Sequence, residues 1–81
     1  MLPAMKLLPL TKLEASQSGT IKEIQGGKGI IARLNALGIF PGKKITKISA
    51  MMLRGPVVLQ VDNTEIAIGF GQASRIIVQV E

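Results

Sequence analysis

Few side chains in this 81-residue sequence could support chemistry. The chain contains no His and no Cys, so the usual nucleophiles, general bases and tight ligands for transition metals are missing. Its five acidic residues are spread along the sequence: Glu14, Glu23, Asp62, Glu65 and Glu81. Asp62 and Glu65 flank a predicted hairpin tip, where carboxylates could meet a hard cation, but Asp is common in such turns for backbone reasons. We therefore predict no catalytic residue, no metal site and no bound cofactor.

A glycine-rich stretch, Gly26-Gly27-Lys28-Gly29, precedes a predicted helix, where free N–H groups can hold a phosphate. The stretch does not fit the P-loop pattern. Lys22 stands where the first glycine is required, and Gly29 follows the lysine in place of Ser or Thr. The pattern is typical of a flexible loop between a strand and a helix, and it predicts no nucleotide binding.

The residues around position 35 predict a short helix and a turn. Apolar residues at helical spacing mark one buried stripe, made of Ile30, Ile31, Leu34 and Leu37. Gly38 fits a left-handed helix cap, with Ile39 folding back onto Leu34. Pro41-Gly42 suits the centre of a type II turn, in which the glycine takes a positive φ.

The rest of the chain reads as short strands separated by turn signals. Strands are predicted over 6–11, 20–24, 43–52, 57–61, 64–68 and 76–80. Ser18-Gly19 is interpreted as a turn, and a bulge is expected near Lys47 because Ile45 and Ile48 break strict alternation. Asp62-Asn63 predicts a tight hairpin, and Gly69 to Ser74 a short turn in which Ala73 is small enough to be buried. Together these elements predict a mainly β fold, a small, partly open β-barrel of about five strands with one short inserted α-helix.

The length favours a single domain over residues 1–81, with residues 1–5 as a loose N-terminal extension. No segment approaches the roughly 20 apolar residues that span a bilayer, so we expect no membrane insertion. The N-terminal stretch is interrupted by Pro3 and Pro9 and lacks the features of a signal peptide. A cytoplasmic location is therefore predicted.

The net charge of +5 comes from ten basic and five acidic residues. Such a balance favours acidic partners, whether a nucleic acid, an anionic lipid surface or an acidic protein face. The alternative is an ordinary solvated surface that keeps an apolar chain in solution.

The helix and its exit carry more apolar residues than a small barrel can bury. Leu37 and Phe40 cannot both be deeply buried if their neighbours are, and Met51-Met52-Leu53 places three apolar residues in a row. An aliphatic patch ringed by basic side chains suits protein docking. The residues predicted to contact a partner are Arg33, Leu37, Phe40, Met51, Met52 and Arg54, with Lys43 in the basic ring. In the alternative interpretation these apolar residues all pack inward at the end of the barrel.

Several motifs, taken in order, resemble those of the FeoA family. They are Gly19-Thr20-Ile21, Arg33-Leu34, Leu37-Gly38-Ile39-Phe40-Pro41-Gly42, Gly55-Pro56-Val57, and Ile66-Ala67-Ile68-Gly69 followed by Ala73 and Ile76. The resemblance implies an SH3-like β-barrel with one inserted helix. It also implies an accessory protein of ferrous iron uptake that binds and modulates a FeoB-type membrane transporter, which carries a cytoplasmic GTPase domain.

Two other classes of function stay open at the level of the sequence. A small SH3-like or KOW-like barrel could bind nucleic acid, which the charge favours, but the absence of Tyr and Trp removes the usual stacking platforms. A homo-oligomer is the second alternative, because open barrel edges and exposed aliphatic residues promote self-assembly.

Overall fold

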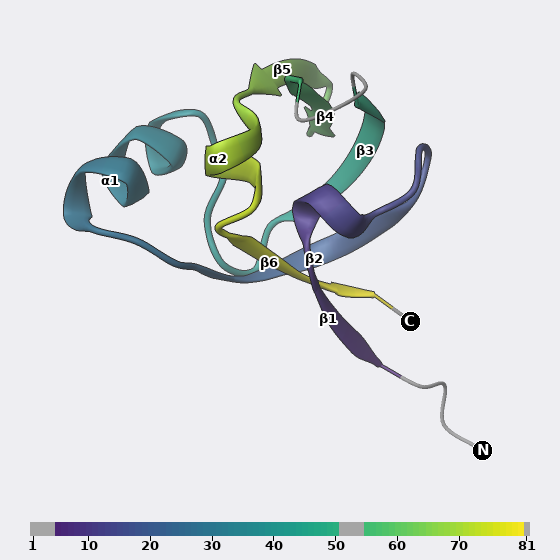
Figure 1. Ribbon diagram of the computed structural model, residues 1–81, viewed down its shortest axis with the longest axis horizontal. Coiled ribbons are helices and arrows are strands. Elements are labelled where there is room, and N and C mark those ends of the chain that lie inside the picture. The colour runs from purple at the N-terminus through teal and green to yellow at the C-terminus, as the bar shows by residue number, and fades with distance from the viewer. Residues whose placement is uncertain (1–4, 51–54, 81) are drawn as a thin grey trace.

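The computed structural model describes residues 5–50 and 55–80 of the chain. Over these residues the chain is mainly β, with short helical segments between strands (Figure 1). The elements in order are β1 (Lys6–Pro9), the 3₁₀ turn η1 (Leu10–Lys12), β2 (Ser18–Ile24), α1 (Lys28–Ala36), β3 (Lys44–Ala50), β4 (Val57–Val61), β5 (Thr64–Ile68), α2 (Phe70–Ala73) and β6 (Ile76–Val80).

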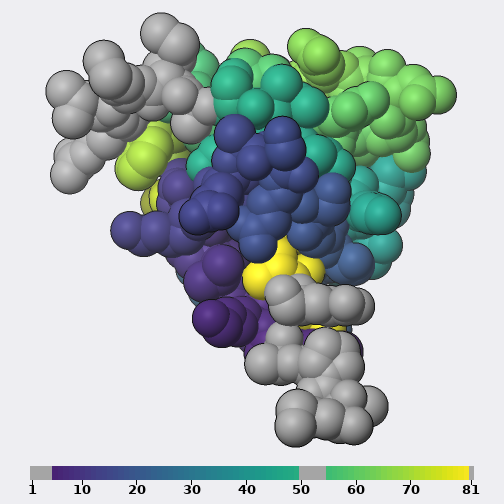
Figure 2. Space-filling view, turned by 90° about the vertical axis from the view of Figure 1, so that its right-hand side faces the viewer, coloured from purple at the N-terminus to yellow at the C-terminus, as the bar shows by residue number. Residues whose placement is uncertain are grey.

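The strands of the described residues form one six-stranded sheet in the order β1-β6-β2-β3-β4-β5, and every neighbouring pair is antiparallel. The C-terminal strand β6 therefore lies between β1 and β2. Figure 2 agrees, because the yellow end of the chain emerges between the purple N-terminal segment and the blue residues of β2. Within the described ranges no pairing joins β1 to β5, so the curled sheet stays open. This confirms a mainly β, partly open architecture, with six strands where the sequence indicated about five.

Alternating aliphatic residues build the core. In β4 and β6 every second side chain is buried, as expected for strands with one face on a hydrophobic interior. The largest fully buried side chains come from across the chain: Leu10, Ile21, Leu34, Ile39, Ile45, Leu59, Ile76, Val57 and Val78. Ala73 in α2 is also fully buried, as predicted.

Lys47 joins this interior although its residue type suggested a solvated position. Its side chain is 5% exposed, and its Nζ donates hydrogen bonds to the carbonyl oxygens of Leu13 at 2.6 Å and Thr11 at 3.2 Å. The backbone N–H of Lys47 donates to the Gln17 carbonyl, and the Lys47 carbonyl accepts from the N–H of Ser16. Burial lowers the pKa of Lys47 below its usual range. One residue of β3 thus holds the connection between β1 and β2 against the sheet.

The predicted bulge near Lys47 is confirmed, because the pairing of β3 with β4 shifts between Lys47 and Ser49. Ile45 and Lys47 share the inner face by ordinary alternation, and the extra residue after Lys47 then turns Ser49 to the outside. A second register shift lies in β2, between Ile21 and Glu23.

The predicted turn at Ser18-Gly19 is wrong, because both residues belong to β2. The chain turns earlier, where Gln17 donates to the carbonyl of Glu14 and Ser16 takes a φ of 72°. Gly19 serves close approach: a Cβ there would lie 2.3 Å from Val78 Cγ1 and 2.8 Å from the Gln79 carbonyl oxygen. Only glycine lets β6 pack this closely on β2.

Candidate protein-docking site

The candidate site is built on the exit of α1. The last turn of α1 ends in a Schellman motif, in which Ile39 N–H donates to the Leu34 carbonyl at 3.0 Å and Gly38 N–H to the Asn35 carbonyl at 2.9 Å. Gly38 takes a φ of 89°, which an L side chain rarely adopts. Leu34 and Ile39 are both fully buried. The predicted cap and its hydrophobic companion are confirmed.

A second turn follows at once and fixes Phe40. The N–H of Lys43 donates to the Phe40 carbonyl at 3.1 Å, and Gly42 has a φ of 93°, as a type II turn requires. Backbone hydrogen bonds between Gly42 and Ile21, and between Ile21 and Lys43, tie this turn to β2. The exit segment is therefore held at both ends by the barrel.

Two large apolar side chains remain exposed on this segment: Leu37 is 42% exposed and Phe40 is 41% exposed. The helical stripe predicted to be buried included Leu37, and that part is wrong. The helix ends at Ala36, so Leu37 is its C-cap with a φ of −88° and a ψ of 1°. The stripe itself is shallow, because Leu34 is its only fully buried member and Ile30 and Ile31 are half-buried.

Charged side chains border the two apolar ones. Arg33 is exposed in the last turn of α1, one helical turn before Leu37. Lys43 Nζ lies 2.8 Å from Asp62 Oδ1 and 5.7 Å from the centroid of the Phe40 ring. Lys43 is thus partly neutralised by Asp62, and its Nζ lies over the Phe40 ring within cation–π range. We name the surface of Arg33, Leu37, Phe40 and Lys43 the helix-exit patch.

Half of the predicted partner contacts fall on described residues. Arg33, Leu37 and Phe40 lie within one short segment, as expected from their spacing. The other predicted partner contacts, Met51, Met52 and Arg54, fall at positions 51–54 and lie outside the described residues.

The structure adds no support for a cation site at Asp62 and Glu65 or for a phosphate site at the glycine-rich loop. Asp62 is engaged by Lys43, and among residues with described positions no three His, Cys, Asp or Glu side chains come together. The glycine-rich loop is shorter than predicted, because Lys28 and Gly29 already belong to α1 and Gly27 is its N-cap. Within the described chain, no helix is long and apolar enough to cross a bilayer.

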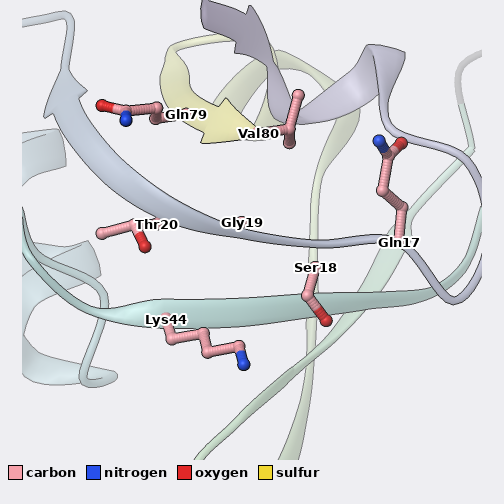
Figure 3. A pocket seen from close by; sticks show the side chains of 7 residues that line it. All are labelled: Gln17, Ser18, Gly19, Thr20, Lys44, Gln79 and Val80. Carbon is pink, nitrogen blue, oxygen red and sulfur yellow. The ribbon is translucent and has the colours of Figure 1, made fainter. Parts of the chain in front are cut away.

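A hollow that the sequence did not predict lies at residues of β2, β3 and β6 (Figure 3). It has a volume of about 390 Å³ and is lined by Gln17, Ser18, Gly19, Thr20, Lys44, Gln79 and Val80. Figure 3 shows the polar ends of Gln17, Lys44 and Gln79 pointing in different directions, so they do not converge on one ligand.

The chain matches the family model of the FeoA domain over residues 8–80. It is 33% identical over 73 residues to a protein of Methanocaldococcus jannaschii named as a candidate Fe(2+) transport protein A, covering 90% of this chain and 87% of that one.

Solved structures show the same architecture. A crystal structure of an iron uptake regulatory protein, FeoA, superposes with a TM-score of 0.83 at 29% identity, covering 93% of this chain and 99% of the other. FeoA of Stenotrophomonas maltophilia, solved with zinc and described as an SH3 domain protein, gives a TM-score of 0.73 at 24% identity, covering 89% and 94%. The T. acidophilum protein IdeR gives 0.82 at 27% identity, with 100% of this chain matching only 37% of that one. The SH3-like fold is thereby confirmed, and the chain belongs to the FeoA family of ferrous iron transport accessory proteins.

Proposed function

We propose that this protein binds the cytoplasmic GTPase domain of a FeoB-type ferrous iron transporter and modulates transport by contact. Membership of the FeoA family supports the link to ferrous iron transport. The observation that carries the contact is the helix-exit patch, where Leu37 and Phe40 stay exposed on a segment that backbone hydrogen bonds hold in place.

The chemistry of the chain supports a role without catalysis. The sequence has no His or Cys, and the FeoA family is not known as a family of enzymes. Iron would be the cargo of the partner, handled by the transporter. The proposed place of action is the cytoplasm, where that GTPase domain lies.

Leu37 and Phe40 are the proposed anchors of the contact. Exposed aromatic and aliphatic side chains become the energetic centre of an interface when a partner covers them. Arg33 and Lys43 lie at the rim. Met51, Met52 and Arg54 stay predicted contacts on the basis of the sequence.

The test is binding of the full chain to a detergent-solubilised FeoB-type transporter from the same genome. Phe40→Ala and Leu37→Ala should each weaken binding by about tenfold, as expected when an interface anchor is truncated. Because neither side chain belongs to the buried core, the circular dichroism spectrum and the midpoint of urea unfolding should stay close to those of the original chain.

Leu7→Ala is the matched control. Leu7 is also an exposed leucine, but it lies on the edge strand β1, away from α1 (Figure 1). Equal losses in Leu7→Ala and Leu37→Ala would remove the helix-exit patch from the interface. Unfolding of both Phe40→Ala and Leu37→Ala would assign these residues to the core.

A further inference from the structure

The charges of this chain are unevenly distributed around α1. No acidic residue occurs between Glu23 and Asp62, whereas that interval contains Lys28, Arg33, Lys43, Lys44, Lys47 and Arg54. The interval includes α1, both turns of its exit and β3. A surface formed mainly from it has little negative charge of its own.

The structure shows which of these charges can act on a partner. Lys47 is buried and Lys43 is paired with Asp62, so neither is a strong external cation. Lys28 and Arg33 are exposed on α1, and neither forms an ion pair with a described residue. The guanidinium of Arg75 adds to them, because it packs near the position that a Cβ of Gly26 would take, just before α1.

We infer that the helix-exit patch docks on an acidic protein surface, with Lys28 and Arg33 steering the approach and Leu37 and Phe40 filling an apolar hollow at its centre. This inference rests on the proposed function and names the chemistry of the partner's side. Opposite charges around an apolar centre speed productive encounter, whereas the buried anchors set the lifetime of the complex.

A protein surface fits this face better than an anionic membrane does. The large apolar residues of α1 face its own domain: Leu34 is fully buried, and Ile30 and Ile31 are half-buried. The exposed positions of α1 include the small Ala32 and Ala36, which allow a neighbouring protein backbone to approach but insert little into lipid.

The experiment measures association and dissociation rates of the full chain on the solubilised FeoB-type transporter at several salt concentrations. Arg33→Glu should lower the association rate by about tenfold at low salt and leave the dissociation rate nearly unchanged. Phe40→Ala should do the reverse, raising the dissociation rate. For the original chain, the association rate should fall steeply as ionic strength rises from about 50 to about 500 mM, because screening shortens the reach of the rim charges.

Lys12→Glu is the matched control, since it changes the net charge by the same amount. Lys12 is exposed in η1, the purple coil well away from α1 in Figure 1. Its association rate should change far less than that of Arg33→Glu.

The outcomes separate this inference from the proposed function. Absence of binding at every salt concentration contradicts the proposed function itself. Binding with equal rate losses in Arg33→Glu and Lys12→Glu, or binding independent of salt, contradicts only the acidic surface. Arg33-dependent binding to vesicles rich in anionic lipid, without binding to transporter in neutral detergent, would assign the patch to membranes instead.

Discussion

Lys47 shows how a single residue can organise a loop of this fold. Its Nζ donates to two carbonyl oxygens of the segment after β1, and its backbone pairs with Ser16 and Gln17. Buried carbonyl groups that lose their donor leave a penalty that apolar packing does not offset. The Lys47 side chain therefore holds the segment between β1 and β2 against β3 by hydrogen bonds.

Lys47→Met should reduce the free energy of unfolding by about 1–3 kcal/mol, because Leu13 and Thr11 lose a buried donor. Lys44→Met on the same strand is the control, and its exposed side chain predicts a change within about 0.5 kcal/mol. Urea unfolding followed by circular dichroism measures both. Equal stability of Lys47→Met and the original chain would show that the hydrogen bonds are energetically neutral.

The same lysine predicts a dependence of stability on pH. Burial lowers the pKa of Lys47 in the folded chain below the ordinary value of 10.5. Between the lowered pKa and 10.5 the unfolded chain binds more protons, so the free energy of unfolding should increase as pH rises through that window. The difference in stability between the original chain and Lys47→Met, measured near pH 8 and again near pH 10, should grow with pH. A flat or falling difference would contradict the assignment.

At the scale of the elements, glycines mark the places where backbone geometry decides the fold. Gly38 closes α1 in the left-handed region, and Gly19 lets β6 lie against β2. Gly29 has neither role, since a Cβ there would meet nothing within 4 Å. Substitution should therefore cause backbone strain at Gly38, a steric clash at Gly19 and only a change in helix propensity at Gly29.

Substituting each glycine by alanine should give three different results. Gly38→Ala should lower stability by about 1–2 kcal/mol through its φ alone, because its Cβ would meet Val61 Cγ1 at an ordinary 3.6 Å. Gly19→Ala should lower it by about 2–4 kcal/mol, since a strand has to shift away from Val78. Gly29→Ala should raise it by about 1 kcal/mol as helix propensity improves. Thermal unfolding of the three variants tests this order.

The elements that alternate cleanly were predictable, and those with local exceptions were not. The strands β4, β5 and β6 have the predicted bounds. In β4 and β6 buried and partly exposed residues alternate strictly, and a tight hairpin turn sets where β4 ends and β5 begins. The turn at Ser18-Gly19 was predicted wrongly because glycine usually interrupts strands. Here the strand needs glycine at position 19, because β6 packs too closely for a Cβ. Lys47 was missed because a lysine is expected on the solvated face of a strand, whereas here it shares the inner face with Ile45 and its Nζ bonds to two carbonyl oxygens.

The backbone conformation of the candidate site could be predicted from the sequence, but the residue at which α1 ends could not. The order Leu-Gly-Ile-Phe-Pro-Gly dictates the cap and the turn, and both are present. The exposure of Leu37 depends on where α1 stops, and a helical stripe cannot specify its own end to one residue. The hollow is lined by residues of β2, β3 and β6, and which strands become neighbours is not encoded by any local pattern.

At the scale of the whole molecule, the amino-acid composition predicts that the protein does not bind Fe(II) tightly. The full sequence offers neither imidazole nor thiolate, and the carboxylates of the described residues do not cluster. Equilibrium dialysis of the purified chain with Fe(II) under anaerobic conditions should show no stoichiometric tight binding. A one-to-one site that survives a competing chelator would contradict a function based on protein contact alone.

The helix cap and the turn that follow one another between Leu34 and Lys43 affect the free energy of binding a partner. Its shape is already specified by main-chain pairing and by two glycines before any partner arrives. Little conformational freedom is then left to lose on complex formation, so a modest contact area can suffice for useful affinity. Gly38→Ala, which removes no side chain of the helix-exit patch, should accordingly weaken association by loosening the unbound segment.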